Sequence, residues 1–246
     1  MSLKKPRPKP GEGRLRLVLL ADQGQPPDLL LMRLSPAERE QAEQRWPAGC
    51  RRRQFLLGRL AAHRAVQRLL AGRVPPPSIQ VLSGPAGEPR ARVDGVEGLV
   101  SVSLAHSGRL ALACAWPGAR CHTGVDLERV RPTDVAHSRY AFSRRERALL
   151  ARAPEGLALA GLAAWTAKEA AWKALWPHQP VSPAGVEIRA LDLERGCAVV
   201  QAPPGRSQFE VRLGLIAGPD GPYLLSIAQL TQYAAQNPYA GDVNHE

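Results

Sequence analysis

The spacing of apolar and polar residues predicts a chain in which strands and helices follow one another twice. Residues 14–20 alternate basic and apolar side chains and indicate a strand. Ser35, with a proline next and Glu38 three positions on, is typical of a helix start. A longer amphipathic helix is expected over about 52–71, and Gly72 ends it.

Further strands are expected where apolar and polar residues alternate cleanly, over 99–107, 109–116 and 122–130. Only Gly108 separates the first two, which predicts a hairpin or a sharply bent strand. Ser143 opens another helix, again with an acid three positions on. The strongest helical segment is 157–176, which Pro177 stops, and the apolar runs beyond it indicate a β-meander.

This order of elements predicts an α+β fold with two halves of similar size, each with strands packed against helices. The expected organisation is a flexible basic tail over 1–13, an N-terminal half over 14–119, a C-terminal half over 120–232 and a loose tail over 233–246. No internal repeat in the sequence is strong enough to prove a duplication.

Composition narrows the class of protein. The hydrophobic fraction of 44% is ordinary for a globular protein, and no apolar run approaches the roughly 18 residues that span a bilayer. The basic, proline-rich start has no long apolar region after it, so no secretory signal is expected. The four cysteines show no CxxC spacing, which argues against a zinc site or a disulfide framework and for a reduced, cytoplasmic protein.

The formal net charge of +11 favours an acidic partner, which is a nucleic acid, an anionic membrane or an acidic protein. Nearly all basic residues are arginines, a bias that a GC-rich genome also produces. Lys168 and Lys173 are the only lysines outside the first ten residues. Because an ammonium is a compact point charge and a guanidinium is a planar fork, the retention of two lysines can matter at a phosphate.

Two carboxylates, Asp126 and Glu128, lie two positions apart in an expected strand and therefore point to the same face. One interpretation places both on a solvent-exposed face. The other makes them joint ligands of a hard divalent cation. The apolar neighbours, and Gly124, which lets another backbone approach closely, favour the cation modestly.

Glu169 and Lys173 lie one helical turn apart and share a face. A surface ion pair is one explanation. However, tryptophans and alanines surround the pair, and a helix that is apolar nearly all round is expected to be buried. Buried charges need pairing or a metal, so we expect these two side chains to line a cleft. A third carboxylate from the helix would suit Mg²⁺.

Two basic features have open interpretations. His106 stands in an AHSGR segment at the end of a strand, where it is structural or, with Ser107 and Arg109, contacts a phosphate. The arginine run over 51–53 is either a solvated basic face or an anion site at a helix N-terminus.

The ordered combination of these segments is more specific than any of them alone. SLAHSGR (103–109), GVDLE (124–128), FSRRE (142–146) and WTAKEAAWK (165–173) occur in this order. The chain thereby resembles the phosphopantetheinyl transferases of the type that activates surfactin synthetase. That family carries a GxDxE strand motif and, some forty residues later, a WxxKExxxK helix motif. The resemblance implies a pseudodimer of two similar α+β halves, each with an antiparallel sheet packed against helices, and an active site at their junction.

The activity that the resemblance implies is transfer of the 4′-phosphopantetheine arm of coenzyme A to a serine of an acyl, peptidyl or aryl carrier protein, with release of 3′,5′-ADP. By match to the motifs, Asp126, Glu128 and Glu169 would ligate Mg²⁺ with the pyrophosphate of coenzyme A, so the C-terminal half carries the metal ligands. Lys173 would neutralise the leaving pyrophosphate. Glu169 or a metal-bound water would be the base for the serine hydroxyl.

The resemblance also implies contacts to the cofactor. His106 with Arg53 would hold the 3′-phosphate, and Ser107 and Lys168 would add secondary contacts. Glu146 matches an acidic position of the family. The sequence departs from the family where many relatives have a Gly-Lys-Pro turn, because residues 87–89 are Gly-Glu-Pro. A basic contact from this loop is then in doubt, although Arg90 or Arg92 can substitute.

The basic surface is expected to attract small, acidic carrier proteins to a monomeric enzyme, with neither nucleic acid nor membrane as a partner. Two alternatives remain. One is another Mg²⁺-dependent phosphoryl-transfer enzyme, such as a nuclease, that uses the same carboxylates. The other is a non-catalytic nucleic-acid-binding protein, which the pI of about 10.2 favours. Against the latter, aromatic residues make up only 5%, and the tryptophans cluster in an apolar helix.

Overall fold

The computed structural model of the protein describes residues 15–118, 123–131, 141–154, 156–175, 182–203 and 207–232. The expected tails, 1–13 and 233–246, lie outside the described residues, as does the expected division between residues 119 and 120. Within the described segments, no helix has both the length and the apolar character to cross a membrane.

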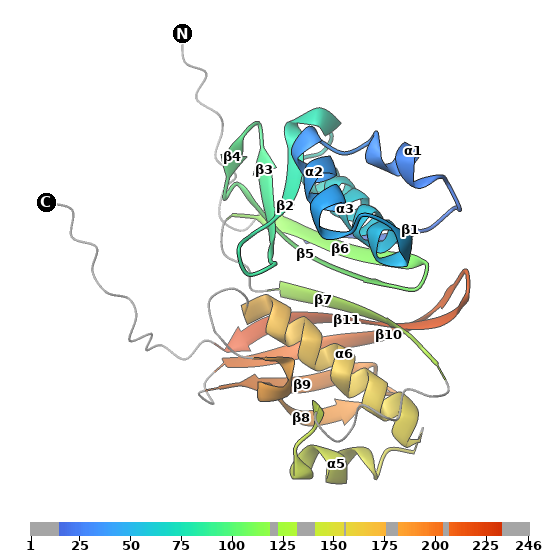
Figure 1. Ribbon diagram of the computed structural model, residues 1–246. Helices are drawn as coiled ribbons and strands as arrows, with labels where there is room; N and C mark the ends of the chain where they lie inside the picture. Colours follow the sequence, from blue (N-terminus) through green and yellow to red (C-terminus); the bar gives the residue numbers. More distant parts are fainter. Residues whose placement is uncertain are drawn as a thin grey trace, which may run out of the picture.

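The N-terminal half consists of two antiparallel sheets and three helices (Figure 1). Its elements are β1 (Arg16–Ala21), α1 (Pro27–Leu31), α2 (Pro36–Arg45), α3 (Gly49–Leu69), β2 (Ile79–Ser83), β3 (Pro89–Val93), β4 (Val96–Glu97), β5 (Val100–Ser107) and β6 (Leu110–Pro117). One sheet has the order β1-β6-β5 and packs against α3, and the other has the order β2-β3-β4.

In the described residues of the C-terminal half, the strands form one five-stranded antiparallel sheet with the order β7-β11-β10-β9-β8. Its elements are β7 (Thr123–Arg129), α5 (Arg144–Leu150), α6 (Leu157–Leu175), β8 (Glu187–Asp192), β9 (Cys197–Ala202), β10 (Ser207–Gly218) and β11 (Gly221–Gln232). The long helix α6 crosses one face of this sheet, and α5 lies near its β8 edge (Figure 1).

The helix starts that the sequence predicts are present. Ser35 accepts a hydrogen bond from the amide of Glu38, whose carboxylate accepts one from the Ser35 amide, and this capping box begins α2. Ser143 and Glu146 do the same for α5. The segment around Gly108 is a hairpin, with eight paired positions between β5 and β6, and not a bent single strand. The α+β fold class is confirmed.

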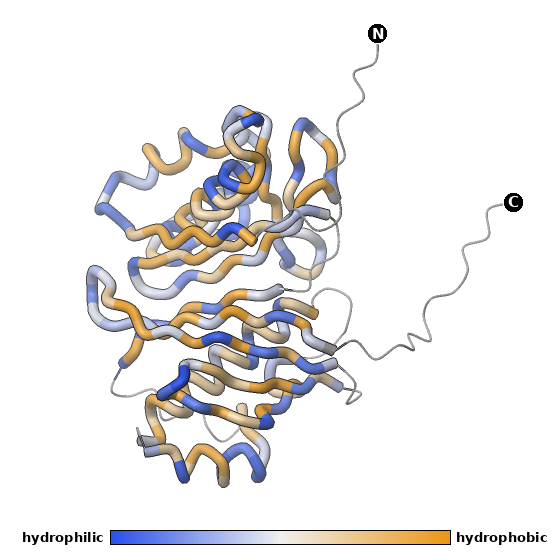
Figure 2. Tube along the Cα trace, turned by 180° about the vertical axis from the view of Figure 1, so that it is seen from behind, coloured by the Kyte–Doolittle hydropathy of each residue, from blue (hydrophilic) through white to orange (hydrophobic). Residues whose placement is uncertain are grey.

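The two halves meet through a shared apolar layer. Figure 2 shows apolar stretches on the strands of both halves along their junction. The cluster there combines buried residues of β5 and β6 with buried residues of β7 and β11, namely Ala105, Leu110, Leu112, Cys114, Trp116, Val125, Leu127 and Tyr223. Strand β7 therefore lies at the junction, with β5 on one side and β11 on the other. A pseudosymmetric relation between the halves stays a prediction.

Candidate functional site

The two strand carboxylates lie at the junction between the halves. Asp126 and Glu128 extend from β7, and the Asp126 side chain is only 4% exposed. The ammonium Nζ of Lys173 lies 2.6 Å from Asp126 Oδ1. The second oxygen of Asp126, Oδ2, is buried and accepts no hydrogen bond from the residues that the structure describes. A buried carboxylate oxygen with a free lone pair can accept a ligand.

Gly124 determines how closely α6 approaches β7. A Cβ atom at this position would lie 2.0 Å from the carbonyl oxygen of Ala170 and 2.7 Å from the amide nitrogen of Ala174. Both atoms belong to the helix backbone, which cannot be displaced by a side-chain rotation. The glycine of the GxDxE pattern is therefore required because it allows the contact that brings Glu169 and Lys173 to Asp126.

Lys173 is shared between two carboxylates. Its Nζ atom lies 3.5 Å from Glu169 Oε2 as well as close to Asp126. Burial alone would lower the pKa of Lys173, but the negative charges of Asp126 and Glu169 raise it above its usual value. The lysine is therefore charged and is the positive centre of this group.

The three carboxylates repel one another. Burial, followed by the charge of Asp126, raises the pKa of Glu128 to about 7. Burial also raises the pKa of Glu169, with a further contribution from Asp126. Ser107 partly offsets this at Glu128, since its hydroxyl donates a hydrogen bond of 3.0 Å to Glu128 Oε2. A cation between these side chains would relieve the repulsion.

The donor set fits a hard divalent cation in its chemistry. It consists of carboxylate oxygens only, which Mg²⁺ and Ca²⁺ prefer, and it includes the unpartnered Oδ2 of Asp126. Among the described residues, no three acidic, histidine or cysteine side chains already converge as a preformed metal site. In this structure the ammonium of Lys173 supplies the positive charge that the carboxylates require.

Lys173, but none of the three carboxylates, lines a cleft of about 540 Å³ whose other walls come mainly from the N-terminal half. Lys173 lines the cleft from the C-terminal half, and the other positively charged residues that line it are Arg45, Arg59 and Arg90. Two carboxylates, Glu88 and Glu97, also line it. Four cations against two anions, both of which pair with Arg90, leave the cleft with a positive charge that favours a negatively charged molecule.

His106 lines the cleft at the end of β5, as the AHSGR segment predicts. The surrounding protein and the nearby ammonium of Lys173 lower the pKa of His106 below its usual value. Ser107, next to it, does not point into the cleft as a free hydroxyl. It donates to Glu128 and accepts a hydrogen bond of 3.1 Å from the amide of Arg129, so that it positions a carboxylate.

The structure places Arg53 outside the lining of the cleft, and its contact with a phosphate stays a prediction. The Arg53 guanidinium binds the carboxylate of Asp22 through both Nε and Nη2, and Arg53 is not among the residues that line the cleft. This ion pair lowers the pKa of Asp22. The arginine of α3 that does line the cleft is Arg59, six positions further along the helix. The sequence offered one signal for it, an arginine on the otherwise apolar side of an amphipathic helix.

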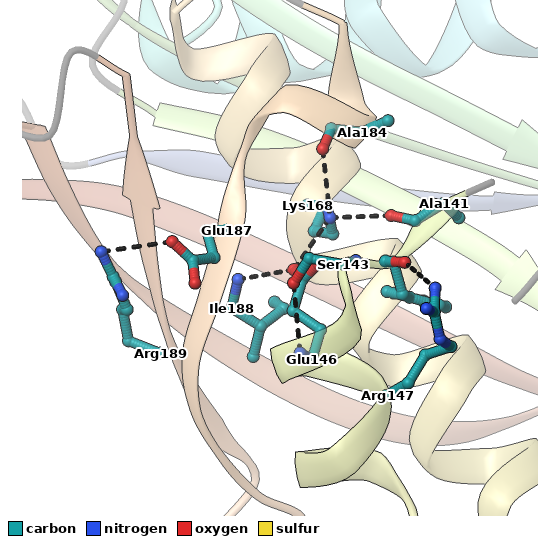
Figure 3. Close-up of polar contacts among 10 residues, drawn as sticks. Ala141, Ser143, Glu146, Arg147, Lys168, Ala184, Glu187, Ile188 and Arg189 are labelled. Carbon is teal, nitrogen blue, oxygen red and sulfur yellow. Dashed lines mark hydrogen bonds and ion pairs between the residues drawn. The ribbon is translucent and has the colours of Figure 1, made fainter. Parts of the chain in front are cut away.

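The structure places Lys168, predicted to contact phosphates, in the core with Glu146 and not at the cleft (Figure 3). Lys168 is fully buried on a different face of α6 from Lys173, and its Nζ donates to Glu146 Oε1 and to the carbonyl of Ala141, both at 2.8 Å. Glu146 also accepts a hydrogen bond from the amide of Ile188. The pair therefore ties α6, α5 and β8 together, and the acid of the FSRRE segment is part of the core.

The loop with Glu88, where many relatives have a lysine, holds an arginine at the cleft. The Glu88 carboxylate accepts a hydrogen bond of 2.7 Å from Arg90 Nε and one of 3.0 Å from the amide of Ala86. Arg90 lines the cleft, whereas Arg92 pairs with Glu97. Of the two expected substitutes for the missing lysine, Arg90 is therefore the one at the cleft.

Residues 122–228 match the family model of the 4′-phosphopantetheinyl transferase superfamily. This stretch includes both acidic motifs, so the resemblance inferred from them is confirmed at the level of the superfamily. A search of the curated proteins found no match. Among solved structures, the holo-[acyl-carrier-protein] synthase of Thermotoga maritima is similar, with 23% identity and a TM-score of 0.36 over 58% of this chain and 79% of that chain.

Proposed function

We propose that this protein, whose residues 122–228 match the 4′-phosphopantetheinyl transferase superfamily, transfers the 4′-phosphopantetheine arm of coenzyme A to a serine of an apo carrier protein. In this reaction the serine oxygen forms a bond to the phosphorus that carries the pantetheine arm. The bond between that phosphorus and the oxygen of 3′,5′-ADP breaks, and 3′,5′-ADP leaves.

The observation that carries this proposal is the meeting of two elements at Lys173, which lines a cationic cleft. Strand β7 contributes Asp126 and Glu128, and helix α6 contributes Glu169 and Lys173. A phosphoryl transfer needs oxygen ligands for a metal and a fixed positive charge for the leaving group, and this arrangement supplies both.

Each side chain has a defined task in the proposed reaction. Glu169, which lies beside Lys173, would remove the proton of the serine hydroxyl. Lys173 binds the pyrophosphate as negative charge develops on 3′,5′-ADP. Ser107 holds Glu128 in place. Mg²⁺, held by Asp126, Glu128 and Glu169, would supply charge neutralisation for the phosphates when bound.

The cleft has the properties that coenzyme A requires. Its volume of about 540 Å³ lies in the usual range for sites of cofactors and other small molecules. Its excess of cations suits a substrate with three phosphate groups. Trp46 and Trp172 add aromatic surface to the lining, against which apolar and ring portions of a substrate can pack.

The second substrate is proposed to be a small, acidic carrier protein, which approaches a monomeric enzyme with a net charge of +11. Opposite charges accelerate such an encounter, and salt screens them. The rate of carrier modification is therefore expected to fall as the ionic strength rises to the physiological value. A rate that does not depend on salt would contradict this part of the proposal.

The decisive test is the intact mass of an apo carrier protein after incubation with coenzyme A, Mg²⁺ and the purified protein. The expected result is a gain of one phosphopantetheine, which is lost when EDTA replaces the metal and when the Asp126→Ala variant replaces the protein. Fatty-acid, polyketide and peptide carriers are tested in parallel. No mass gain on any of them would overturn the proposal, and degradation of added DNA would favour a nuclease instead.

A further inference from the structure

A buried tyrosine near the start of β11 has no role in the reaction described so far. Tyr223 is fully buried in the apolar layer between the halves, yet its hydroxyl makes two polar contacts. It accepts a hydrogen bond of 2.9 Å from the amide of Arg109, in the turn between β5 and β6, and it donates to the carboxylate of Asp220, in the turn between β10 and β11. Burial and this carboxylate raise the pKa of Tyr223, so the phenol keeps its proton at neutral pH.

The turn between β5 and β6 lies directly against this tyrosine. A Cβ atom at Gly108 would lie 2.3 Å from the Tyr223 hydroxyl oxygen, and the φ angle of Gly108 is +50°, which favours glycine. A Cβ atom at Gly218 of β10 would lie 2.4 Å from the ring carbon Cε2. Figure 1 shows the β10–β11 turn curving toward the β5–β6 turn. The backbone of both halves therefore holds the tyrosine in place.

Asp220 links the same tyrosine to the end of β7. Its Oδ1 atom accepts the hydrogen bond from Tyr223, and its Oδ2 atom lies 3.1 Å from Nη1 of Arg129. The amide of Arg129 donates a hydrogen bond of 3.1 Å to Ser107, whose hydroxyl donates one of 3.0 Å to the preceding residue, Glu128. Two connections from Tyr223 therefore converge on Ser107, one along the β5–β6 turn and one along the end of β7.

The position of Glu128 depends on this support more than that of an isolated carboxylate would. The charges of Asp126 and Glu169 repel it. Within the described part of the chain, no cation forms an ion pair with Glu128, and Ser107 is the group that donates a hydrogen bond to its carboxylate. One neutral hydrogen bond is a weak restraint against two like charges, so the place of the carboxylate depends on how firmly Ser107 is held.

We propose that Tyr223 is a positioning residue for Glu128, because it binds both turns and thereby holds the Ser107 hydroxyl against this carboxylate. The inference rests on the proposed function, in which Glu128 is a metal ligand. It gives a role to a residue outside both acidic motifs. Groups that hydrogen-bond a ligating carboxylate orient it toward the metal, so the loss of their support weakens the metal site.

The test measures Mn²⁺ binding to the metal-free protein by calorimetry, without coenzyme A. Tyr223→Phe removes the hydroxyl and keeps the ring, and the dissociation constant for Mn²⁺ is expected to rise roughly tenfold. Thr231→Val is the control on the same strand, because it removes a hydroxyl whose hydrogen bond of 3.1 Å goes to the carbonyl of Gln208 on β10. This control is expected to bind Mn²⁺ as tightly as wild type does.

A second background shows whether the effect passes through Ser107. Ser107→Ala is expected to weaken Mn²⁺ binding by itself. Adding Tyr223→Phe to it is expected to cause little further loss, since the contact that Tyr223 supports is already missing. The inference is overturned if Tyr223→Phe keeps the Mn²⁺ affinity of wild type, if the loss is equal in both backgrounds, or if wild type binds no Mn²⁺.

Circular dichroism and a melting curve check that Tyr223→Phe folds. If it does not, Asp220→Asn breaks the ion pair with Arg129 at constant size, and it is compared in the same two backgrounds with the same expected results. The carrier assay separates the two proposals. A wild-type protein that transfers phosphopantetheine while Tyr223→Phe binds Mn²⁺ normally refutes only this inference. If wild type transfers nothing while Tyr223→Phe loses Mn²⁺ affinity, only the proposed reaction fails.

Discussion

Lys173 donates a hydrogen bond of 2.6 Å from Nζ to Oδ1 of Asp126, and this contact joins the last part of α6 to strand β7. The same ammonium lies 3.5 Å from Glu169. The Lys173 ammonium is therefore the positive charge next to Asp126 and Glu169, two of the proposed metal ligands. In the proposed reaction, substrate and metal would draw the lysine toward the phosphates, and cofactor binding would then be coupled to metal binding.

The variant Lys173→Met tests this coupling. Transfer is expected to fall by roughly a hundredfold or more, because one preorganised charge at the leaving group is lost. Mn²⁺ binding without coenzyme A, measured by calorimetry, is expected to become tighter, since no ammonium competes for the carboxylates. The Lys173→Arg variant, which keeps the charge, serves as the control. Weaker or unchanged Mn²⁺ binding in Lys173→Met would contradict the competition.

Glu128 predicts how stability depends on pH in the metal-free protein. Burial and the adjacent carboxylates raise its pKa from 4.5 to about 7, so the folded state holds the proton more tightly than the unfolded state does. The stability that the proton provides is fully present below about pH 4.5 and is lost as the pH rises through 7.

In EDTA, the Glu128→Gln variant is therefore expected to melt at a higher temperature than wild type at pH 8, by roughly 5 °C, and at nearly the same temperature at pH 4.5. Differential scanning calorimetry at both pH values measures the difference. Transfer activity is expected to be lost at both. If the gap in Tm did not widen between pH 4.5 and pH 8, Glu128 would not be a strained carboxylate.

Lys168 is expected to affect stability and not substrate binding. Lys168→Met leaves the carboxylate of Glu146 buried without its cation, which costs roughly 3–5 kcal/mol. The free energy of unfolding, from urea titration, is expected to fall by that amount while KM for coenzyme A stays unchanged. Replacing both partners, as Lys168→Met with Glu146→Gln, is expected to recover part of the loss. A rise in KM without a loss of stability would restore Lys168 as a phosphate contact.

Gly124→Ala tests the close approach of α6 to β7. The added methyl group would lie 2.0 Å from the carbonyl oxygen of Ala170, so the helix has to move and carry Glu169 and Lys173 away from Asp126. Transfer is expected to be almost abolished and the melting temperature to fall. Gly161→Ala in α6 is the matched control, because no atom lies within 4 Å of its added methyl group and alanine favours the helix by about 1 kcal/mol. That variant is expected to be active and at least as stable as wild type.

Much of the local structure could be predicted because its causes are local. The capping boxes at Ser35 and Ser143 form between residues three positions apart, and both are present. The predicted strand over 122–130 and helix over 157–176 agree closely with β7 and α6. The small sheet β2-β3-β4 and the short helix α1 were not predicted, since their segments are too short to show a period and depend on packing against α2 and α3.

Local periodicity was enough to predict that Asp126 shares a strand face with Glu128 and that Glu169 shares a helix face with Lys173, because strand and helix periods fix the relative directions of side chains. Which of these faces lie against each other depends on how α6 packs against β7. Lys168 and Glu169 are neighbours on α6, yet Lys168 lies in the core with Glu146 and Glu169 lies beside Lys173 at the junction of the halves. On α3, Arg59 lines the cleft and Arg53 does not. A helical period relates the faces of one element, whereas the choice of the face that becomes a site depends on residues far away in the chain.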